Sequence, residues 1–172
     1  GAGKSTVLSA ASSSGYTIVN YGDLMFQIAS KKFKVKHRDE LRKLDIEKQK
    51  AVQAAVGRAL SKMKGKVILD THCSISTPKG YLPGLPFHLL SKLKVSHLVL
   101  ITAPIEEIIS RRNSDKTRVR DEQSPESLSE HDFINKAYLA AYSSLSGAPA
   151  VIILNRNGGL EEAQKKLLQL LE

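Results

Sequence analysis

Apolar residues along the chain follow two different spacings. Four short runs are apolar and rich in β-branched residues, which predicts strands, and they cover residues 17–21, 66–70, 96–102 and 150–154. Longer segments repeat apolar residues at helical spacing, which predicts helices over residues 21–31, 38–63, 85–93, 104–113, 127–146 and 160–171. Strands that alternate with helical crossovers predict a parallel sheet covered by helices on both faces.

Local signals support three of the helix starts. Asp45 precedes a long periodic run, and Pro104 stands at a first-turn position. Ser127 is followed by Glu130 at the spacing of a capping box. These signals predict helices that begin close to the three positions.

Two segments interrupt the alternation. Residues 77–86 are rich in proline and glycine, and we expect a loop there at the carboxyl end of a strand, where ligand sites of parallel sheets lie. Residues 111–123 place several cations among polar residues, namely Arg111, Arg112, Lys116, Arg118 and Arg120. So many guanidinium groups favour a lid that closes over phosphate, with a solvated charged loop as the alternative.

Composition narrows the class of protein. The 172 residues, 41% of them hydrophobic and 25% charged, suffice for one domain with one core, and no linker divides them. No apolar run approaches the roughly 20 residues of a spanning helix, so we expect a soluble protein without membrane contact. A lone cysteine, Cys73, favours a reducing interior. The formal charge of +9 suits an anionic ligand such as a nucleotide or a nucleic acid.

The first six residues, Gly1-Ala2-Gly3-Lys4-Ser5-Thr6, match the closing half of the phosphate-binding pattern G-x-x-x-x-G-K-[ST]. In that pattern glycines let the backbone approach phosphate, the lysine places a charge at the β- and γ-phosphates, and the Ser5 hydroxyl ligates Mg²⁺. A buried strand normally precedes the loop. We therefore expect that the first strand is missing from this sequence, and that the natural protein begins about ten residues earlier.

Asp70 ends the apolar strand at residues 66–70. In a protein with a phosphate-binding loop, an acidic group at this place holds Mg²⁺ directly or through water. The alternative is that Asp70 caps a turn or a helix. We favour the metal role, which makes Ser5 and Asp70 the candidate metal ligands.

Several strings along the chain carry a family resemblance: residues 3–6, 20–25, 38–44, 70–72, 77–86 and 117–121. The chain resembles the adenylate kinases of archaea, a branch of the nucleoside monophosphate kinases in the P-loop superfamily, over nearly its whole length. The resemblance implies a three-layer α/β sandwich of the P-loop NTPase kind, with one kinase domain over residues 1–172. It places the AMP-binding region at about residues 21–63 and an arginine-rich lid at about 111–124.

The resemblance also implies an activity and its residues. The activity is reversible phosphoryl transfer from ATP to AMP with Mg²⁺, giving two ADP, in a cytoplasmic enzyme that forms homotrimers. Carried over by position, the ATP-phosphate loop is Gly1, Ala2, Gly3, Lys4, Ser5 and Thr6, and the AMP site includes Asp23, Arg38 and Arg42. The lid arginines are Arg111, Arg118 and Arg120, and Asn155 resembles the contact to the ATP base.

The chain departs from other adenylate kinases at the acceptor site. Phe26 and the string 71–73 stand where bacterial and eukaryotic members carry arginines. The AMP phosphate must then meet other cations, with Arg38, Arg42 and Lys79 as candidates. The lid also lacks the cysteine cluster of some bacterial relatives, so we expect no structural zinc.

Two other functions stay open at this point. One is a different small-molecule kinase, for example one that acts on CMP, dCMP or shikimate. The other is a nucleotide-dependent RNA-binding or ribosome-assembly factor, which the net charge and the cationic run at residues 31–38 would suit. We regard that run mainly as a solvated surface beside the AMP site, so nucleic-acid binding is the less favoured alternative.

Overall fold

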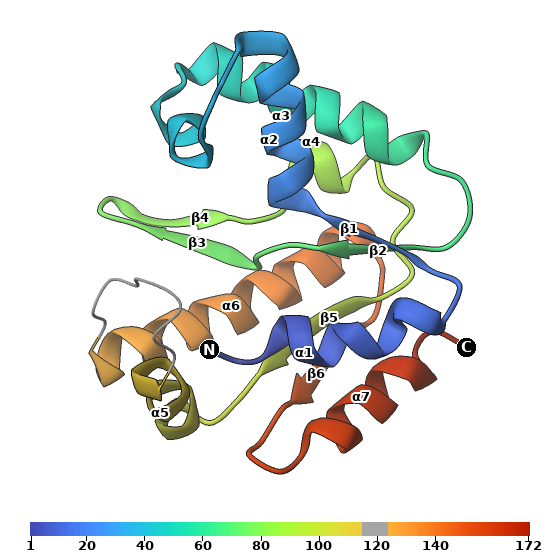
Figure 1. Ribbon diagram of the computed structural model, residues 1–172, viewed down its shortest axis with the longest axis vertical. Coiled ribbons are helices and arrows are strands. Elements are labelled where there is room, and N and C mark those ends of the chain that lie inside the picture. The colour runs from blue at the N-terminus through green and yellow to red at the C-terminus, as the bar shows by residue number, and fades with distance from the viewer. Residues whose placement is uncertain (115–123) are drawn as a thin grey trace.

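The computed structural model describes residues 1–114 and 124–172, apart from the side chains of Asp39, Arg42 and Lys43 (Figure 1). Its strands are β1 (Thr17–Asn20), β2 (Val67–Asp70), β3 (Ser74–Thr77), β4 (Gly80–Pro83), β5 (Leu98–Thr102) and β6 (Ala150–Leu154). Its α-helices are α1 (Lys4–Leu8), α2 (Tyr21–Phe33), α3 (Ile46–Ser61), α4 (Phe87–Leu90), α5 (Ile105–Ser114), α6 (Pro125–Ser146) and α7 (Leu160–Gln169). The described residues also form two 3₁₀ helices, η1 (Ser9–Ser13) and η2 (Arg38–Lys43).

The four predicted strands are confirmed, and they pair in parallel. β1 pairs with β2 in the register Thr17↔Val67 to Asn20↔Asp70, and β5 pairs with β6. No strand of the described residues joins β2 to β5, so the parallel strands form two separate pairs instead of one continuous sheet. The α/β class is confirmed, because helices connect and flank these parallel strands.

Helices cover both faces of the β5–β6 pair (Figure 1). Ile153 of β6 is fully buried in a cluster that α1 and α7 complete with Val7 and Leu167. Helix α6 packs against the same strand pair from the other side. A second cluster joins α2, α3 and α4, and its buried members include Val56 and Leu89. Burial of these apolar faces is the main force that holds the layers together.

The helix-start signals were right in two places and wrong in one. Asp45 caps α3, since its carboxylate accepts a hydrogen bond of 2.8 Å from the Lys48 N–H. Pro104 directly precedes α5. The predicted start at Ser127 is wrong, because Pro125 occupies the first turn and the Ser124 hydroxyl caps the helix. A proline in the first turn costs no hydrogen bond, which favours this earlier start.

Two further expectations are corrected. The segment 38–63 is not one helix: η2 ends at Lys43 and α3 begins after the Asp45 cap. Residues 77–86 are not only a loop, because they contain β4, which pairs antiparallel with β3. Gly80 makes the turn possible with φ at +115°, and the Tyr138 hydroxyl donates to the Tyr81 carbonyl at 3.1 Å, which ties the hairpin to α6.

None of the helices within residues 1–114 and 124–172 has both the length and the apolar character needed to cross a membrane.

Candidate active site

The first residues form a tight turn that leads into α1. Gly3 has a left-handed backbone (φ +76°), and its carbonyl accepts a hydrogen bond of 3.0 Å from the Val7 N–H. A Cβ at Gly3 would lie 2.4 Å from Asn155 Nδ2, and a Cβ at Gly1 would lie 2.7 Å from Ile108 Cγ2. Both glycines are therefore required by close contacts inside the protein.

Lys4 reaches from the start of α1 to the end of β2. Its Nζ lies 2.6 Å from Asp70 Oδ1 and donates a hydrogen bond of 2.9 Å to the Thr71 carbonyl. The Asp70 side chain is only 11% exposed, so the pair is partly shielded from water. The neighbouring Ser5 is exposed, and its hydroxyl makes no hydrogen bond to the part of the chain that the structure describes.

Asn20 links this pair to the next strand. It ends β1 and lies opposite Asp70 in the register. Its Nδ2 donates to Asp70 Oδ2 at 3.0 Å, while its Oδ1 accepts from the Asp23 N–H at 3.0 Å and from Arg38 Nη2 at 3.4 Å. Asn20 therefore caps α2 and connects Asp70 with Arg38.

Asp23 and Arg38 lie together beyond Asn20. The Arg38 guanidinium forms an ion pair with the Asp23 carboxylate, and the two side chains are 54% and 60% exposed respectively. The structure thus brings two of the predicted acceptor residues together. Arg42 lies in η2 with its side chain outside the described part, and Lys79 is exposed at the turn between β3 and β4, on a different element.

Asn155 fixes the opening turn from the other side. It is only 6% exposed, its Nδ2 donates to the Ala2 carbonyl at 2.9 Å, and its N–H donates to the Thr102 carbonyl at 2.8 Å. The side chain thus binds the chain's own backbone in this structure. A contact between Asn155 and the ATP base stays a prediction.

Arg111 holds the residues that follow Asn155. Its Nη2 donates to the Asn155 carbonyl at 3.0 Å and to Asn157 Oδ1 at 2.7 Å, and it pairs with Glu107 at 2.9 Å. Arg111 lies in the last turn of α5, so the helix expected over residues 104–113 is confirmed, and residues 111–114 belong to it and not to the loop expected over 111–123. Arg118 and Arg120 lie outside the described residues.

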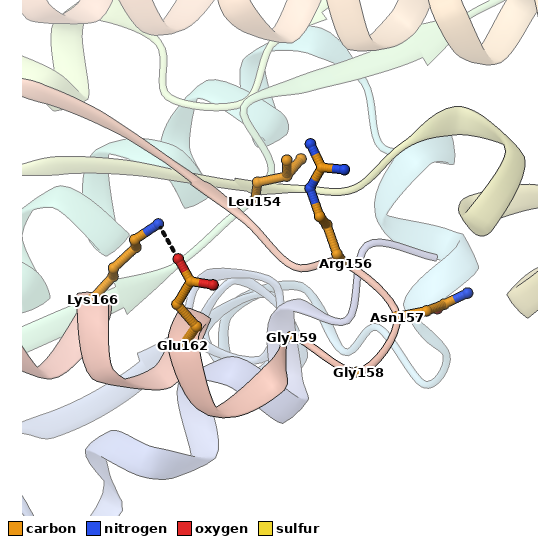
Figure 2. A pocket seen from close by; sticks show the side chains of 7 residues that line it. All are labelled: Leu154, Arg156, Asn157, Gly158, Gly159, Glu162 and Lys166. Carbon is orange, nitrogen blue, oxygen red and sulfur yellow. Dashed lines mark ion pairs between the residues drawn. The ribbon is translucent and has the colours of Figure 1, made fainter.

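A cavity of about 450 Å³ opens beside this loop (Figure 2). Its lining residues are Leu154, Arg156, Asn157, Gly158, Gly159, Glu162 and Lys166. Glu162 and Lys166 form an ion pair at 2.7 Å across one wall. The cavity lies directly after β6, at the carboxyl edge where ligands of α/β sheets bind.

Comparisons with known proteins bear on the family of this chain. A family profile described as "AAA domain" matches residues 1–129. The adenylate kinase of Thermoplasma acidophilum is 45% identical over 99% of this chain and 93% of its own length. The adenylate kinase of Methanocaldococcus jannaschii is 43% identical over 91% of this chain and 83% of its own length. That of Methanothermobacter thermautotrophicus is 42% identical over 100% of this chain and 95% of its own length.

The chain belongs to the adenylate kinase family. The resemblance to the archaeal adenylate kinases is confirmed, and so is the enzyme class, a phosphotransferase of the nucleoside monophosphate kinase type. Members of a P-loop kinase family work mainly by positioning phosphates and stabilising their charge. The partly buried Lys4–Asp70 pair, which joins the start of α1 to the end of β2, is a candidate centre for such a site.

Some residues of the candidate site escaped the sequence analysis. Asn20 was not singled out, although its place between a strand end and a helix start is the one signal that could have found it. Glu107 and Asn157 were missed as well, and Glu107 Oε2 accepts a hydrogen bond of 2.6 Å from the Asn157 N–H. No local pattern connects two residues that are 50 positions apart.

Proposed function

We propose that this adenylate kinase transfers a phosphoryl group from ATP, bound at residues 1–6, to AMP, bound beside Asp23 and Arg38. One observation carries the proposal: a continuous chain of polar contacts joins Lys4 through Asp70 and Asn20 to Arg38. Donor and acceptor phosphates must lie close together and in line for direct transfer. A contact network between the two candidate regions supports a shared reaction centre.

In this proposal each side chain has a separate electrostatic role. The Lys4 ammonium binds the β- and γ-phosphates as a point charge, and Arg38 with Arg42 binds the phosphate of AMP. Arg111, Arg118 and Arg120 stabilise the charge that develops on the transferred group, and Lys79 is a further candidate for the acceptor phosphate. No general base is needed, because the transition state is loose and charge stabilisation dominates.

The donor set also suits Mg²⁺. The Ser5 hydroxyl is exposed at the start of α1, and the Asp70 carboxylate ends β2, so both supply hard oxygen atoms of the kind that Mg²⁺ prefers. When bound, Mg²⁺ would neutralise charge on the phosphates of ATP. In the structure Lys4 already pairs with Asp70, so we propose that the incoming phosphates draw the ammonium away from the carboxylate.

A panel of acceptors tests the proposal. Coupled-assay rates with AMP, CMP, dCMP and shikimate, each with ATP and Mg²⁺, should show a kcat/KM for AMP at least about tenfold above the others. A higher value for another acceptor would assign the site to a different small-molecule kinase. Rates that depend on added RNA would favour the RNA-linked alternative.

Assembly and location are also part of the proposal. We propose a homotrimer and a cytoplasmic location, since the resemblance to archaeal adenylate kinases implies the first and the lone Cys73 favours the second. Light scattering coupled to size-exclusion chromatography measures the mass directly. A mass near that of one chain would contradict the trimer.

A further inference from the structure

Positive charge is distributed very unevenly along this chain. Between residues 48 and 105 there are nine lysines and arginines and a single carboxylate, Asp70. That carboxylate is largely buried and paired with Lys4, so it cannot offset charge at the surface. The surface of the elements from α3 to β5 therefore carries an excess of positive charge that can attract an anionic ligand.

Five of these cations gather at one end of the fold, and we call them the lysine patch: Arg58, Lys62, Lys64, Lys92 and Lys94. All five are exposed, and none forms an ion pair with a residue of the described ranges. Helices α3 and α4 pack together, and the stem of Lys92 would lie 3.9 Å from a Cβ on Gly57 of α3. The packing therefore brings the ends of both helices, with their lysines, to the same side.

The lysine patch lies at the opposite end of the strands from the kinase site. Lys62 and Lys64 precede β2, and Lys92 and Lys94 precede β5, whereas Asp70 ends β2. Figure 1 shows both connections on the right of the molecule, with the strands running away from them. A four-residue strand spans about 13 Å, so a ligand on the patch need not block nucleotide binding.

The chemistry of the lysine patch suits a phosphate backbone. Leu93 and Val95 turn inward to the core, which leaves the lysines outward, and Met63 is the one large apolar side chain exposed among residues 61–66 and 91–97. Stable membrane attachment needs a second, apolar signal besides basic residues. Nucleic-acid backbone binding needs only the cations.

The dipole of α3 explains part of this cluster, because cations are stabilised near a helix C-terminus. It accounts for Arg58 and Lys62, which lie in or next to the last turn of α3. Lys64, Lys92 and Lys94 lie outside that helix. These three side chains need another explanation.

We propose that the lysine patch binds the phosphate backbone of RNA without sequence preference, at a surface separate from the kinase site. The Lys66 ammonium lies 5.2 Å from the centroid of the Tyr16 ring and so covers one face of it, and the patch itself contains no aromatic side chain. Recognition is therefore electrostatic and depends strongly on salt.

The cationic run at residues 31–38 is less suited to this role. Arg38 pairs with Asp23, Lys32 lies over the Phe33 ring, and four carboxylates follow within residues 39–47. These neighbours weaken the positive field there. The run nevertheless supplies a control with the same charge change.

The test measures binding of the full chain to a fluorescein-labelled single-stranded RNA of about 20 nucleotides, longer than common single-strand sites. Saturating ADP keeps the RNA out of the nucleotide site. One variant carries Lys62→Gln, Lys64→Gln, Lys92→Gln and Lys94→Gln. The matched control carries Lys31→Gln, Lys32→Gln, Lys34→Gln and Lys36→Gln, so both have a formal charge of +5 instead of +9.

The patch variant should lose at least about tenfold in RNA affinity at about 50 mM salt, while the control loses less than about threefold. The slope of log K against log salt should fall from about −3.5 to about −0.7 as four of five phosphate contacts disappear. Kinase rates of the patch variant should stay at the level of the unaltered protein, which shows that it is folded.

Equal losses of RNA affinity in the two variants would overturn the proposal, because binding would then depend on net charge alone. A larger loss of affinity in the control would place the RNA site at residues 31–38. Absence of RNA binding by the unaltered protein at low salt would also overturn it. So would patch-dependent binding to phosphatidylserine vesicles without binding to RNA. None of these outcomes bears on phosphoryl transfer, which the acceptor panel measures separately.

Discussion

The proposed donor and acceptor ends of the polar network are built in different ways. At the donor end, Lys4, Asp70 and Asn155 come from distant parts of the chain and lie partly or largely buried. At the acceptor end, Asp23 and Arg38 are 15 residues apart and more than half exposed. Exposed pairs contribute at most about 1 kcal/mol, whereas shielded contacts hold positions more firmly. The fold therefore holds the proposed donor end more firmly than the proposed acceptor end.

The largest effect should follow from removing the charge at the donor end. Lys4→Ala should lower kcat by about 10²- to 10³-fold, because one preorganised donor to the developing charge is lost. Steady-state kinetics and circular dichroism of the same sample make the measurement. Lys50→Ala, which removes an exposed lysine paired with Glu47, is the control and should leave kcat unchanged. Near-normal turnover by folded Lys4→Ala would place the donor phosphates elsewhere.

A pair of glycine variants separates backbone strain from close contact. Gly3 and Gly15 both have φ at +76°, but only Gly3 has a neighbour, Asn155 Nδ2, within reach of a Cβ. Gly15→Ala should cost about 1–2 kcal/mol in unfolding free energy from strain alone and leave the KM for ATP unchanged. Gly3→Ala should cost more and raise the KM for ATP at least about tenfold, since the turn must shift.

Urea denaturation and kinetics with ATP varied measure both properties. Equal behaviour of the two glycine variants would mean that the Gly3–Asn155 contact does not shape the donor site.

At the acceptor end, Arg38→Ala and Arg42→Ala should raise the KM for AMP by about 30-fold, or about 2 kcal/mol for a charge-assisted bond, and leave that for ATP unchanged. Stability should change by less than about 1 kcal/mol, because the Asp23–Arg38 pair is exposed. Asp23→Ala breaks the same pair but keeps the cation. If Asp23→Ala raises the KM for AMP as much as Arg38→Ala does, the arginine only positions Asp23. If the arginine variants change the KM for AMP and for ATP equally, Lys79 becomes the candidate for the acceptor phosphate.

The smallest effect concerns Cys73, a partly buried residue that follows β2. Cys73 lies three residues after Asp70, its thiol donates to the Asn135 carbonyl at 3.1 Å, and burial raises its pKa to about 11 from an ordinary 9.0. Above pH 9 the unfolded chain releases this proton more readily than the folded one, so stability falls as pH rises toward 11. After allowance for the partial exposure of the thiol, the free energy of unfolding should fall by about 1 kcal/mol.

Chemical denaturation at several pH values between 8 and about 11, compared with Cys73→Ala, isolates this contribution. Buried tyrosines, among them Tyr142 with a pKa raised to about 12, titrate in both proteins, so the difference belongs to the cysteine. If the unfolding free energy of the two proteins falls in parallel with pH, the Cys73 thiol is more open to water than the structure indicates.

The sequence by itself determined the local features of this protein. The four parallel strands lie where continuous apolar runs predicted them, and Asp45 caps α3 as its position before the run indicated. The opening Gly1–Thr6 string and the strand-ending Asp70 also singled out two segments that the structure joins through the Lys4–Asp70 ion pair. Period, caps and motifs are short-range signals, which a single sequence carries without knowledge of the fold.

Tertiary structure decided what depends on segments far apart in the chain. Only folding shows that Asn20 joins Asp70 to Arg38, that Asn155 holds the Ala2 carbonyl, and that residues 77–86 contribute a strand. The lysines that follow α3 and α4 likewise become one surface only when the two helices pack. These contacts arise because burying apolar faces fixes which elements become neighbours, and no local spacing encodes that choice.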